Sequence, residues 1–375
     1  MKINILTKGF LSPTSRGWLH PILNNKSTLF EMGLNINFYQ KYSEKVKDCD
    51  LVIVESKFVR ADWRKDKSKI FELLSNLKTK NNKIFYYDLG DNTYSWGLET
   101  LPYVDKLLKP FIFKDKNYYC VPLEGFNILT DFYCKQGIID SNISLKHKIL
   151  PEKSYFIKKN EKHLLEKIHV GFNSTFADNG LDSSLWKYNF FSRSVRHLFN
   201  IYSLMLKHTK LEDYISPASY RSQDISCRIS TNGYSSGINF HRNLASKILK
   251  EHLNTSKLNR KEYFYEMRNS KVVFSPFGWG EINVPRDYEV ALCGAILVKP
   301  DISHFDTWPN IFNKDTVVQC KWDLSDLLEK LDKILNNHSD YLKYAINLQD
   351  QYKYYSYGKS GQEKFCNYFF NMVKN

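Results

Sequence analysis

The chain has 375 residues, of which 42% are hydrophobic and 25% are charged. These values are typical of a folded globular protein and exclude a disordered chain, and the length suffices for two domains of ordinary size. Lysine and arginine total 54 against 40 aspartate and glutamate residues, a formal net charge of +14. Such an excess suits nucleic acid, an anionic membrane surface or a phosphorylated ligand. Because the lysines are spread widely and form no dense block, we do not expect nucleic acid as a partner.

The cysteines and the N-terminus indicate the compartment. The 7 cysteines are scattered and include no C-x-x-C pair or Cys/His ligand spacing, so the sequence predicts neither a zinc site nor a disulfide framework. The first ten residues, MKINILTKGF, are predicted to form a strand because their apolar core is too short for a signal peptide. No window approaches the roughly eighteen apolar residues of a membrane span. We therefore expect a reduced, cytoplasmic protein.

The first half of the chain alternates predicted strands with predicted helices. Short apolar runs predict strands at residues 2–6, 34–39, 50–55, 83–87, 104–108 and 168–172. Helical spacing of apolar side chains predicts helices at 18–32 and 63–77, and an irregular aromatic-rich stretch covers 111–133. This alternation is typical of a doubly wound parallel sheet. It predicts a first Rossmann-like domain over residues 1–210.

The second half repeats the alternation. A long helical segment at 185–208 is expected to connect the halves, and strands are predicted at 224–230, 271–274, 294–298 and 316–320. Helices are predicted at 240–253, 261–268, 284–292, 324–335 and 341–373, the last broken near residue 357. We expect a second Rossmann-like domain over 211–355 and a C-terminal helix, 356–375, that packs back on the first domain.

The stretch from Ser275 to Trp308 contains the main candidate site. A predicted buried strand is followed by a loop with Gly278 and Gly280, then by a helix and a second strand. Glu281 lies in the loop and Glu289 lies eight positions later on the helix. Ligands of a parallel sheet collect at the carboxyl ends of its strands, so this loop is expected to face a ligand.

This pattern resembles the donor-binding signature of GT-B glycosyltransferases, in which an E-x7-E pair, here Glu281 and Glu289, precedes a small-residue turn, here residues 293–295. It is also similar to a subgroup of bacterial glycosyltransferases whose loop reads SPFGWGE and whose next strand ends in KPD, followed by a histidine and TWP. In this chain those are residues 275–281, 299–301, His304 and 307–309. The resemblance covers residues 222–368 best.

The resemblance implies an α/β protein of the GT-B fold, with two Rossmann-like domains facing each other across a cleft. The C-terminal domain would bind a nucleotide sugar and the N-terminal domain an acceptor. No metal or other cofactor is implied, because cationic side chains and helix N-termini neutralise the leaving diphosphate. The E-x7-E pair favours a retaining reaction.

The resemblance also implies roles for individual residues. Glu289 would bind the ribose; the alternative is a solvated helix carboxylate paired with Arg286. Glu281 would approach the donor sugar as a catalytic residue, or would be an acidic residue favoured by the helix dipole. Lys299 and His304 would contact the donor.

Further donor contacts are expected from the residues themselves. Gly278 and Gly280 would let backbone N–H groups approach the donor. Arg228 ends the first strand of the second half and is a candidate phosphate ligand, beside the loop 233–237 and the start of the next helix. His241 and Arg242 at that helix start either join it or lie on the surface.

On the acceptor side the sequence leaves several candidates open. Asp88 and Asp91 lie at a strand end in YYDLGDN, the edge where a general base for an acceptor hydroxyl belongs. Aspartates at such positions also start turns. Arg16 and His20 face the same edge, and Glu124 is a third carboxylate candidate.

The expected function is transfer of a hexosyl group from a nucleotide-sugar donor to a saccharide or lipid-linked acceptor in bacterial surface-polysaccharide assembly. The basic surplus predicts peripheral contact with the inner face of an anionic membrane. Two alternatives remain. One is a transferase of the same fold that uses a CMP-linked acidic sugar. The other is a non-catalytic sugar-nucleotide-binding or epimerase-like α/β protein.

Overall fold

The computed structural model describes residues 1–9, 12–94, 96–125, 127–139, 155–173, 214–231, 236–278, 280, 286–356 and 358–375. We call residues 1–173 the N-terminal part and residues 214–356 the C-terminal part. The helix expected at 185–208 lies outside the described residues.

The N-terminal part is built on a six-stranded parallel sheet of order β2-β1-β3-β4-β5-β7. Its strands are β1 (Lys2–Leu6), β2 (Asn35–Tyr39), β3 (Leu51–Glu55), β4 (Lys83–Tyr87), β5 (Lys106–Lys109) and β7 (Ile168–Val170). The connecting α-helices are α1 (Pro13–Asn24), α2 (Lys26–Glu31), α3 (Asp62–Lys65), α4 (Ser68–Leu77) and α5 (Ile128–Lys135). Shorter 3-10 helices are η2 (Glu44–Lys47), η3 (Trp96–Tyr103), η4 (Lys116–Cys120) and η5 (Lys159–Lys167).

The C-terminal part is built on a four-stranded parallel sheet of order β12-β10-β9-β8. Its strands are β8 (Gln223–Ser226), β9 (Ser270–Phe274), β10 (Ile296–Pro300) and β12 (Val318–Cys320). Its helices are α7 (Ser236–Leu249), α8 (Arg260–Asn269), α9 (Arg286–Cys293), α10 (Leu327–Asn336) and α11 (His338–Ser356), and α12 (Gly358–Lys374) follows. The two parallel sheets confirm the expected α/β class and the pair of sheets that a GT-B fold requires.

The central strands were predictable because they are buried on both faces. Every residue of β3 and of β10 is buried, as expected for parallel strands covered by helices on either side, whose sequences are continuous apolar runs. The strand expected at 224–230 ends earlier, at Ser226. The C-terminal helical segment consists of two helices that meet near Gly358, which has a φ of +61°, a value that glycine adopts without steric cost.

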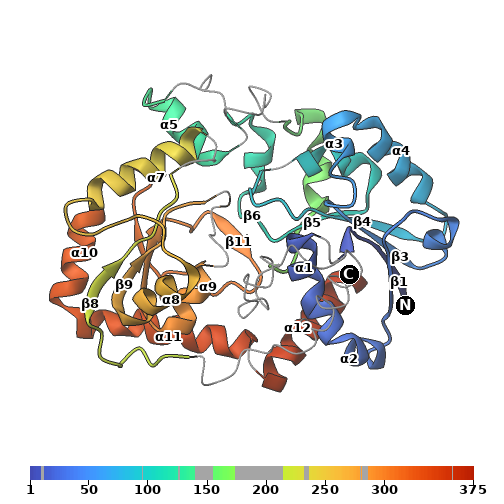
Figure 1. Cartoon of the computed structure of the whole chain (residues 1–375). Helices are drawn as coiled ribbons and strands as arrows, with labels where there is room; N and C mark the ends of the chain where they lie inside the picture. The colour runs from blue at the N-terminus through green and yellow to red at the C-terminus, as the bar shows by residue number, and fades with distance from the viewer. Residues whose placement is uncertain are drawn as a thin grey trace, which may run out of the picture.

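A short antiparallel pair of strands links the two sheets (Figure 1). β6 (Phe111–Phe113) pairs with β11 (Phe305–Thr307). Each follows a main strand that ends in Lys-Pro, Lys109-Pro110 before β6 and Lys299-Pro300 before β11. After these prolines the chain leaves each sheet, and the two exits pair with each other as β6 and β11.

Helix α12 crosses back to the N-terminal part and lies beside α1 and α2 (Figure 1). The ring of Phe365 lies 5.1 Å from that of Phe172, which in turn stacks on Trp18 at 5.9 Å. Trp308, after β11, stacks on Tyr368 of α12 at 4.1 Å. The end of the chain thus completes the core beneath the first sheet.

Candidate functional site

The two sheets approach each other at their carboxyl edges, and a cavity of about 720 Å³ lies between the parts. One wall comes from η4 and α5 of the N-terminal part, and the other from the segments that follow β10 and β12. The residues that line the cavity include Tyr118, Asp131, Phe132, Lys135, Asp301, His304 and Trp322. The carboxyl edge of a parallel sheet is the usual ligand-binding edge, and this volume suits a nucleotide-sized ligand.

His304, predicted as a donor contact, lines this cavity. Its Nδ1 lies 3.6 Å from the carboxylate of Asp301, and its ring lies 5.6 Å from that of Trp322. The Trp322 indole N–H donates to the main-chain oxygen of Asp301 at 2.7 Å. The loop after β10 is thereby tied to the loop after β12, which holds His304 at the cavity wall.

Lys299, the first residue of the KPD segment, was also predicted to contact the donor. It does not line the cavity. Its side chain is 0% exposed and forms an ion pair with Asp287, whose side chain is also 0% exposed. The other oxygen of Asp287 accepts a hydrogen bond from the Ser275 hydroxyl at 2.7 Å. These three residues join the end of β9, the start of α9 and the end of β10. Asp287 was not predicted from the sequence, although a charged residue among the buried positions of α9 is a signal for such a partner.

A similar pair occurs in the N-terminal part. Lys109 ends β5, is fully buried, and lies 2.7 Å from the carboxylate of Asp88. The other oxygen of Asp88 accepts from the N–H of Gly90 at 2.8 Å. Asp88 is therefore held by a buried lysine at the edge of its sheet, as Asp287 is in the second sheet.

Asp91, the other candidate base, is in a different position. Asp91 is exposed, and no ion pair joins its carboxylate to another residue within the described ranges. Desolvation by the surrounding protein raises the pKa of its carboxyl; Lys57 opposes this rise and Asp88 adds to it. Of the two predicted aspartates, Asp91 is thus the one with a carboxylate open to a ligand.

Gly278 and Gly280 lie at the junction of the two parts, where the Gly278 N–H donates to the Gly280 oxygen at 3.2 Å. A β carbon on Gly280 would lie 2.0 Å from the main-chain oxygen of Asp91 and 2.9 Å from Phe111. The structure therefore brings the loop after β9 against the loop after β4. Glu281 lies outside the described residues.

Glu289 is buried on α9, and its Oε1 lies 2.8 Å from Nη1 of Arg260 on α8. The alternative expectation, a solvated carboxylate paired with Arg286, is wrong, since Glu289 is buried and Arg286 donates to the main-chain oxygen of Arg228 at 2.5 Å. The role of Glu289 toward a ribose stays a prediction.

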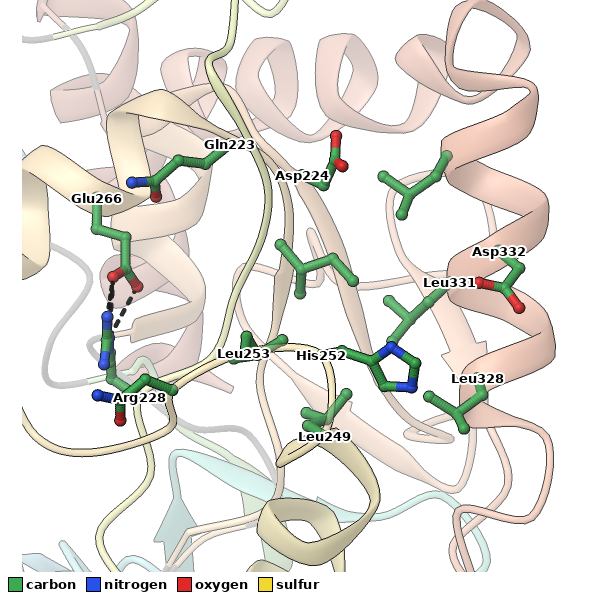
Figure 2. A pocket seen from close by; sticks show the side chains of 13 residues that line it. Gln223, Asp224, Arg228, Leu249, His252, Leu253, Glu266, Leu328, Leu331 and Asp332 are labelled. Atoms are coloured by element: carbon green, nitrogen blue, oxygen red, sulfur yellow. Dashed lines mark hydrogen bonds and ion pairs between the residues drawn. The ribbon is translucent and has the colours of Figure 1, made fainter.

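Arg228 is separated from the cavity between the parts. It lines another cavity, of about 470 Å³, along the open edge strand β8 (Figure 2). Its Nε lies 2.9 Å and 3.0 Å from the two carboxylate oxygens of Glu266, and its Nη1 donates to Ser256 at 3.0 Å. In Figure 2 this pair occupies one end of the cavity, and leucines of α7 and α10 occupy the other. The two cavities share no lining residue.

His241 and Arg242, near the start of α7, are buried rather than on the surface. His241 Nδ1 lies 3.1 Å from the hydroxyl of Tyr133, which donates its hydrogen to the main-chain oxygen of Trp322 at 2.7 Å. Nδ1 is therefore the donor in the first contact. Burial lowers the pKa of His241 to about 3, so the ring is neutral. Its Nε2 has no hydrogen-bond partner in the described part of the chain.

The acceptor-side candidates are dispersed. Arg16 and His20 are buried on α1, and the amide of Asn24 lies 3.1 Å from His20 Nε2. Glu124 is half-buried beside α5, where its N–H donates to Asp131 at 3.3 Å.

Glu55 at the end of β3 was likewise not predicted from the sequence as a site residue. This buried carboxylate accepts hydrogen bonds from the hydroxyls of Thr7 and Ser15 and from two main-chain N–H groups. Burial nonetheless raises its pKa.

No helix in the described ranges is long and apolar enough to cross a membrane. The same residues contain no group of three histidine, cysteine or acidic side chains that could hold a metal ion.

A scan against protein-family models finds no match, and no curated protein sequence matches the chain. Solved structures do resemble it in architecture. Anabaena HepE, crystallised with UDP, is 11% identical, with 99% of this chain and 100% of HepE covered and a TM-score of 0.40. A glycosyltransferase from Rickettsia africae is 10% identical, with 100% and 99% covered and a TM-score of 0.42. A protein from Listeria monocytogenes assigned as a UDP-N-acetylglucosamine 2-epimerase is 11% identical, with 100% and 95% covered and a TM-score of 0.37.

Proposed function

We propose that this chain is a metal-independent glycosyltransferase that moves a sugar from a nucleotide-sugar donor to a saccharide or lipid-linked acceptor held between its two parts. One observation carries the proposal. A cavity between the two parts is lined by η4 and α5 of the N-terminal part and by the segments that follow β10 and β12, and the KPD–H segment of the resemblance forms part of the second wall through Asp301 and His304.

The donor is assigned to the C-terminal part. The loop after β9 contains Gly278 and Gly280, and α9 begins at Arg286. The positive end of a helix dipole favours an anionic diphosphate. The buried Ser275–Asp287–Lys299 group fixes the start of α9 to two strands. Lys299 thus acts by positioning, while Glu289 is assigned to the ribose and Glu281 to the donor sugar.

The acceptor is assigned to the N-terminal part, with Asp91 as the candidate base. Asp88 is already paired with Lys109, whereas Asp91 is exposed and has a raised pKa. In an inverting transfer, Asp91 takes the proton of the acceptor hydroxyl as the new bond forms. In a retaining transfer, which the resemblance favours, an oxygen of the leaving diphosphate takes that proton on the same face, and Asp91 only orients the hydroxyl.

Thermal unfolding with UDP, UDP-glucose, GDP, ADP and CMP tests the donor assignment. A ligand at about a hundred times its Kd stabilises the folded state by about 2.7 kcal/mol. We expect one nucleotide to raise the Tm of the wild type and not that of Glu289→Gln. Glu99→Gln is the matched control, because Glu99 on η3 is also a glutamate with an ion-pair partner. Its carboxylate lies 2.6 Å from Nζ of Lys67. If no nucleotide shifts the wild type, the proposal is wrong; a shift by CMP alone would favour the acidic-sugar alternative.

Turnover separates a transferase from a binding protein or an epimerase. The nucleotide that binds is supplied as its sugar conjugate, and the release of free nucleotide and of altered sugar is followed by chromatography. A glycosyltransferase releases nucleotide, even by slow hydrolysis when no acceptor is present. An epimerase-like protein would convert the sugar, and a binding protein would return the donor unchanged.

A further inference from the structure

Three large side chains are exposed on η4, η5 and the residues that flank them. Tyr118 on η4 is 36% exposed, Val121 just after η4 is 43% exposed, and Phe156 before η5 is 37% exposed. The Val121 N–H donates to the Tyr118 oxygen at 3.4 Å, and the Ile157 N–H donates to the Tyr119 oxygen at 2.9 Å. Tyr119 and Ile157 are buried, whereas their neighbours Tyr118 and Phe156 are exposed on the two segments that this second hydrogen bond joins.

Lysines surround these side chains. The two 3-10 helices and their flanks carry six lysines, one of which, Lys167, donates to main-chain oxygens of Leu101 and Val104. The other five are Lys114, Lys116, Lys158, Lys159 and Lys162, and the acidic residues are Asp115, Glu161 and Glu166. Asp115 is engaged in capping η4, where it accepts from the Asn117 N–H at 2.9 Å. We call these residues, together with Tyr118, Val121 and Phe156, the η4–η5 surface. It combines a basic surplus with a small apolar centre.

The η4–η5 surface continues into the candidate site. Tyr118 belongs to it and also lines the cavity between the two parts. Whatever binds the surface therefore lies at the entrance to that cavity. Aromatic side chains prefer the headgroup level of a bilayer, and each lysine close to an anionic membrane surface contributes about 1 kcal/mol of attraction. A neutral or basic protein surface would not attract these lysines in this way.

We propose that the η4–η5 surface docks on an anionic phospholipid membrane and sets the cavity mouth at the lipid–water interface. Val121 and Phe156 enter the headgroup region, and the lysines bind lipid phosphates. The membrane contact stands on the surface itself; only its purpose, access to a lipid-linked acceptor, rests on the function proposed above.

Cosedimentation with vesicles tests this docking. We expect the full chain to bind phosphatidylglycerol vesicles at least about tenfold more strongly than phosphatidylcholine vesicles, with binding that weakens as salt rises. Val121→Ser/Phe156→Ser and Lys158→Glu/Lys159→Glu should each lower binding to phosphatidylglycerol by about tenfold or more.

The matched control is Tyr265→Ser/Lys261→Glu on α8, where Tyr265 is 68% exposed and Lys261 is exposed. It should bind vesicles as the wild type does, and unchanged melting curves would show that all variants are folded. Equal binding to both vesicle types, or equal losses in the control and the η4–η5 variants, would overturn the proposal.

The nucleotide-induced Tm shift is measured without vesicles. A variant that keeps this shift but loses vesicle binding supports the docking, whereas a wild type that shows the shift but binds neither vesicle refutes the docking alone.

Discussion

The main-chain oxygen of Asp91 lies so close to Gly280 that a β carbon on that glycine would be 2.0 Å away. Asp91 follows a strand of the first sheet and Gly280 follows a strand of the second. The two loops that carry the candidate base and the candidate donor contacts therefore touch directly. Any change in this contact alters the spacing of the two halves of the proposed site.

Gly280→Ala should separate these loops. Because the clash is with main chain rather than with the end of a flexible side chain, we expect a loss of about 1–3 kcal/mol in the free energy of unfolding, together with a loss of turnover. Gly137→Ala serves as the control: that glycine has a φ of +67° and open space around it, so only backbone strain of about 1–2 kcal/mol applies and turnover is retained. Urea unfolding measures the stability of both. Wild-type turnover by Gly280→Ala would contradict the contact.

Lys299→Met should be strongly destabilising, because it leaves the carboxylate of Asp287 buried without its cation. Breaking one partner of a buried ion pair costs about 3–5 kcal/mol. Asp287→Asn should cost a similar amount. The double variant Lys299→Met/Asp287→Asn should recover part of this loss, since no uncompensated charge remains. A double-mutant cycle by urea denaturation checks the coupling, and additive losses would show that the pair is not the unit we describe.

The substitution Asp91→Asn should have opposite effects on stability and on activity. The pKa of its carboxyl is raised in the folded protein, so its contribution to stability is fully present below the unfolded-state pKa and is lost as the pH rises through the folded-state value. At pH 7, Asp91→Asn should therefore raise the Tm slightly while lowering kcat/KM. If Asp91 is the base, the acid limb of the pH profile lies above the ordinary range of an aspartate and disappears in the variant. An unchanged kcat in Asp91→Asn would instead support the retaining reaction.

His241 should make the protein acid-sensitive. Burial lowers its pKa to about 3 from the ordinary histidine value of 6.5, so the unfolded chain binds the proton first and stability falls as the pH drops below about 6.5. The loss from this residue reaches about 2–3 kcal/mol by pH 4.5. His241→Gln should flatten the decline relative to the wild type. His169, whose pKa burial lowers to about 4, adds a decline of the same sign to both proteins, so their difference isolates His241.

Much of the architecture was predictable from the sequence for one physical reason. Parallel strands with helices on both faces are apolar throughout, so β3 and β10 stand out as short β-branched runs. Glycine and proline mark where these elements end. The α/β class and the candidate loop after β9 follow from such local patterns, whereas the His304 segment was indicated by the resemblance to glycosyltransferases.

Pairings between distant residues depended on the tertiary structure. The three-residue strands β6 and β11 are too short to stand out, and each exists only because the other lies beside it. Glu289 pairs with Arg260 of another helix rather than with Arg286 one turn away. Lys299 was expected to contact the donor and Lys109 was not singled out, yet the fold buries both lysines against aspartates. The sequence alone determined the strands of the two parallel sheets and the longer helices between them, because those depend on local apolar spacing. Only the tertiary structure decided which charges meet, because burial and proximity arise when the sheets and helices pack.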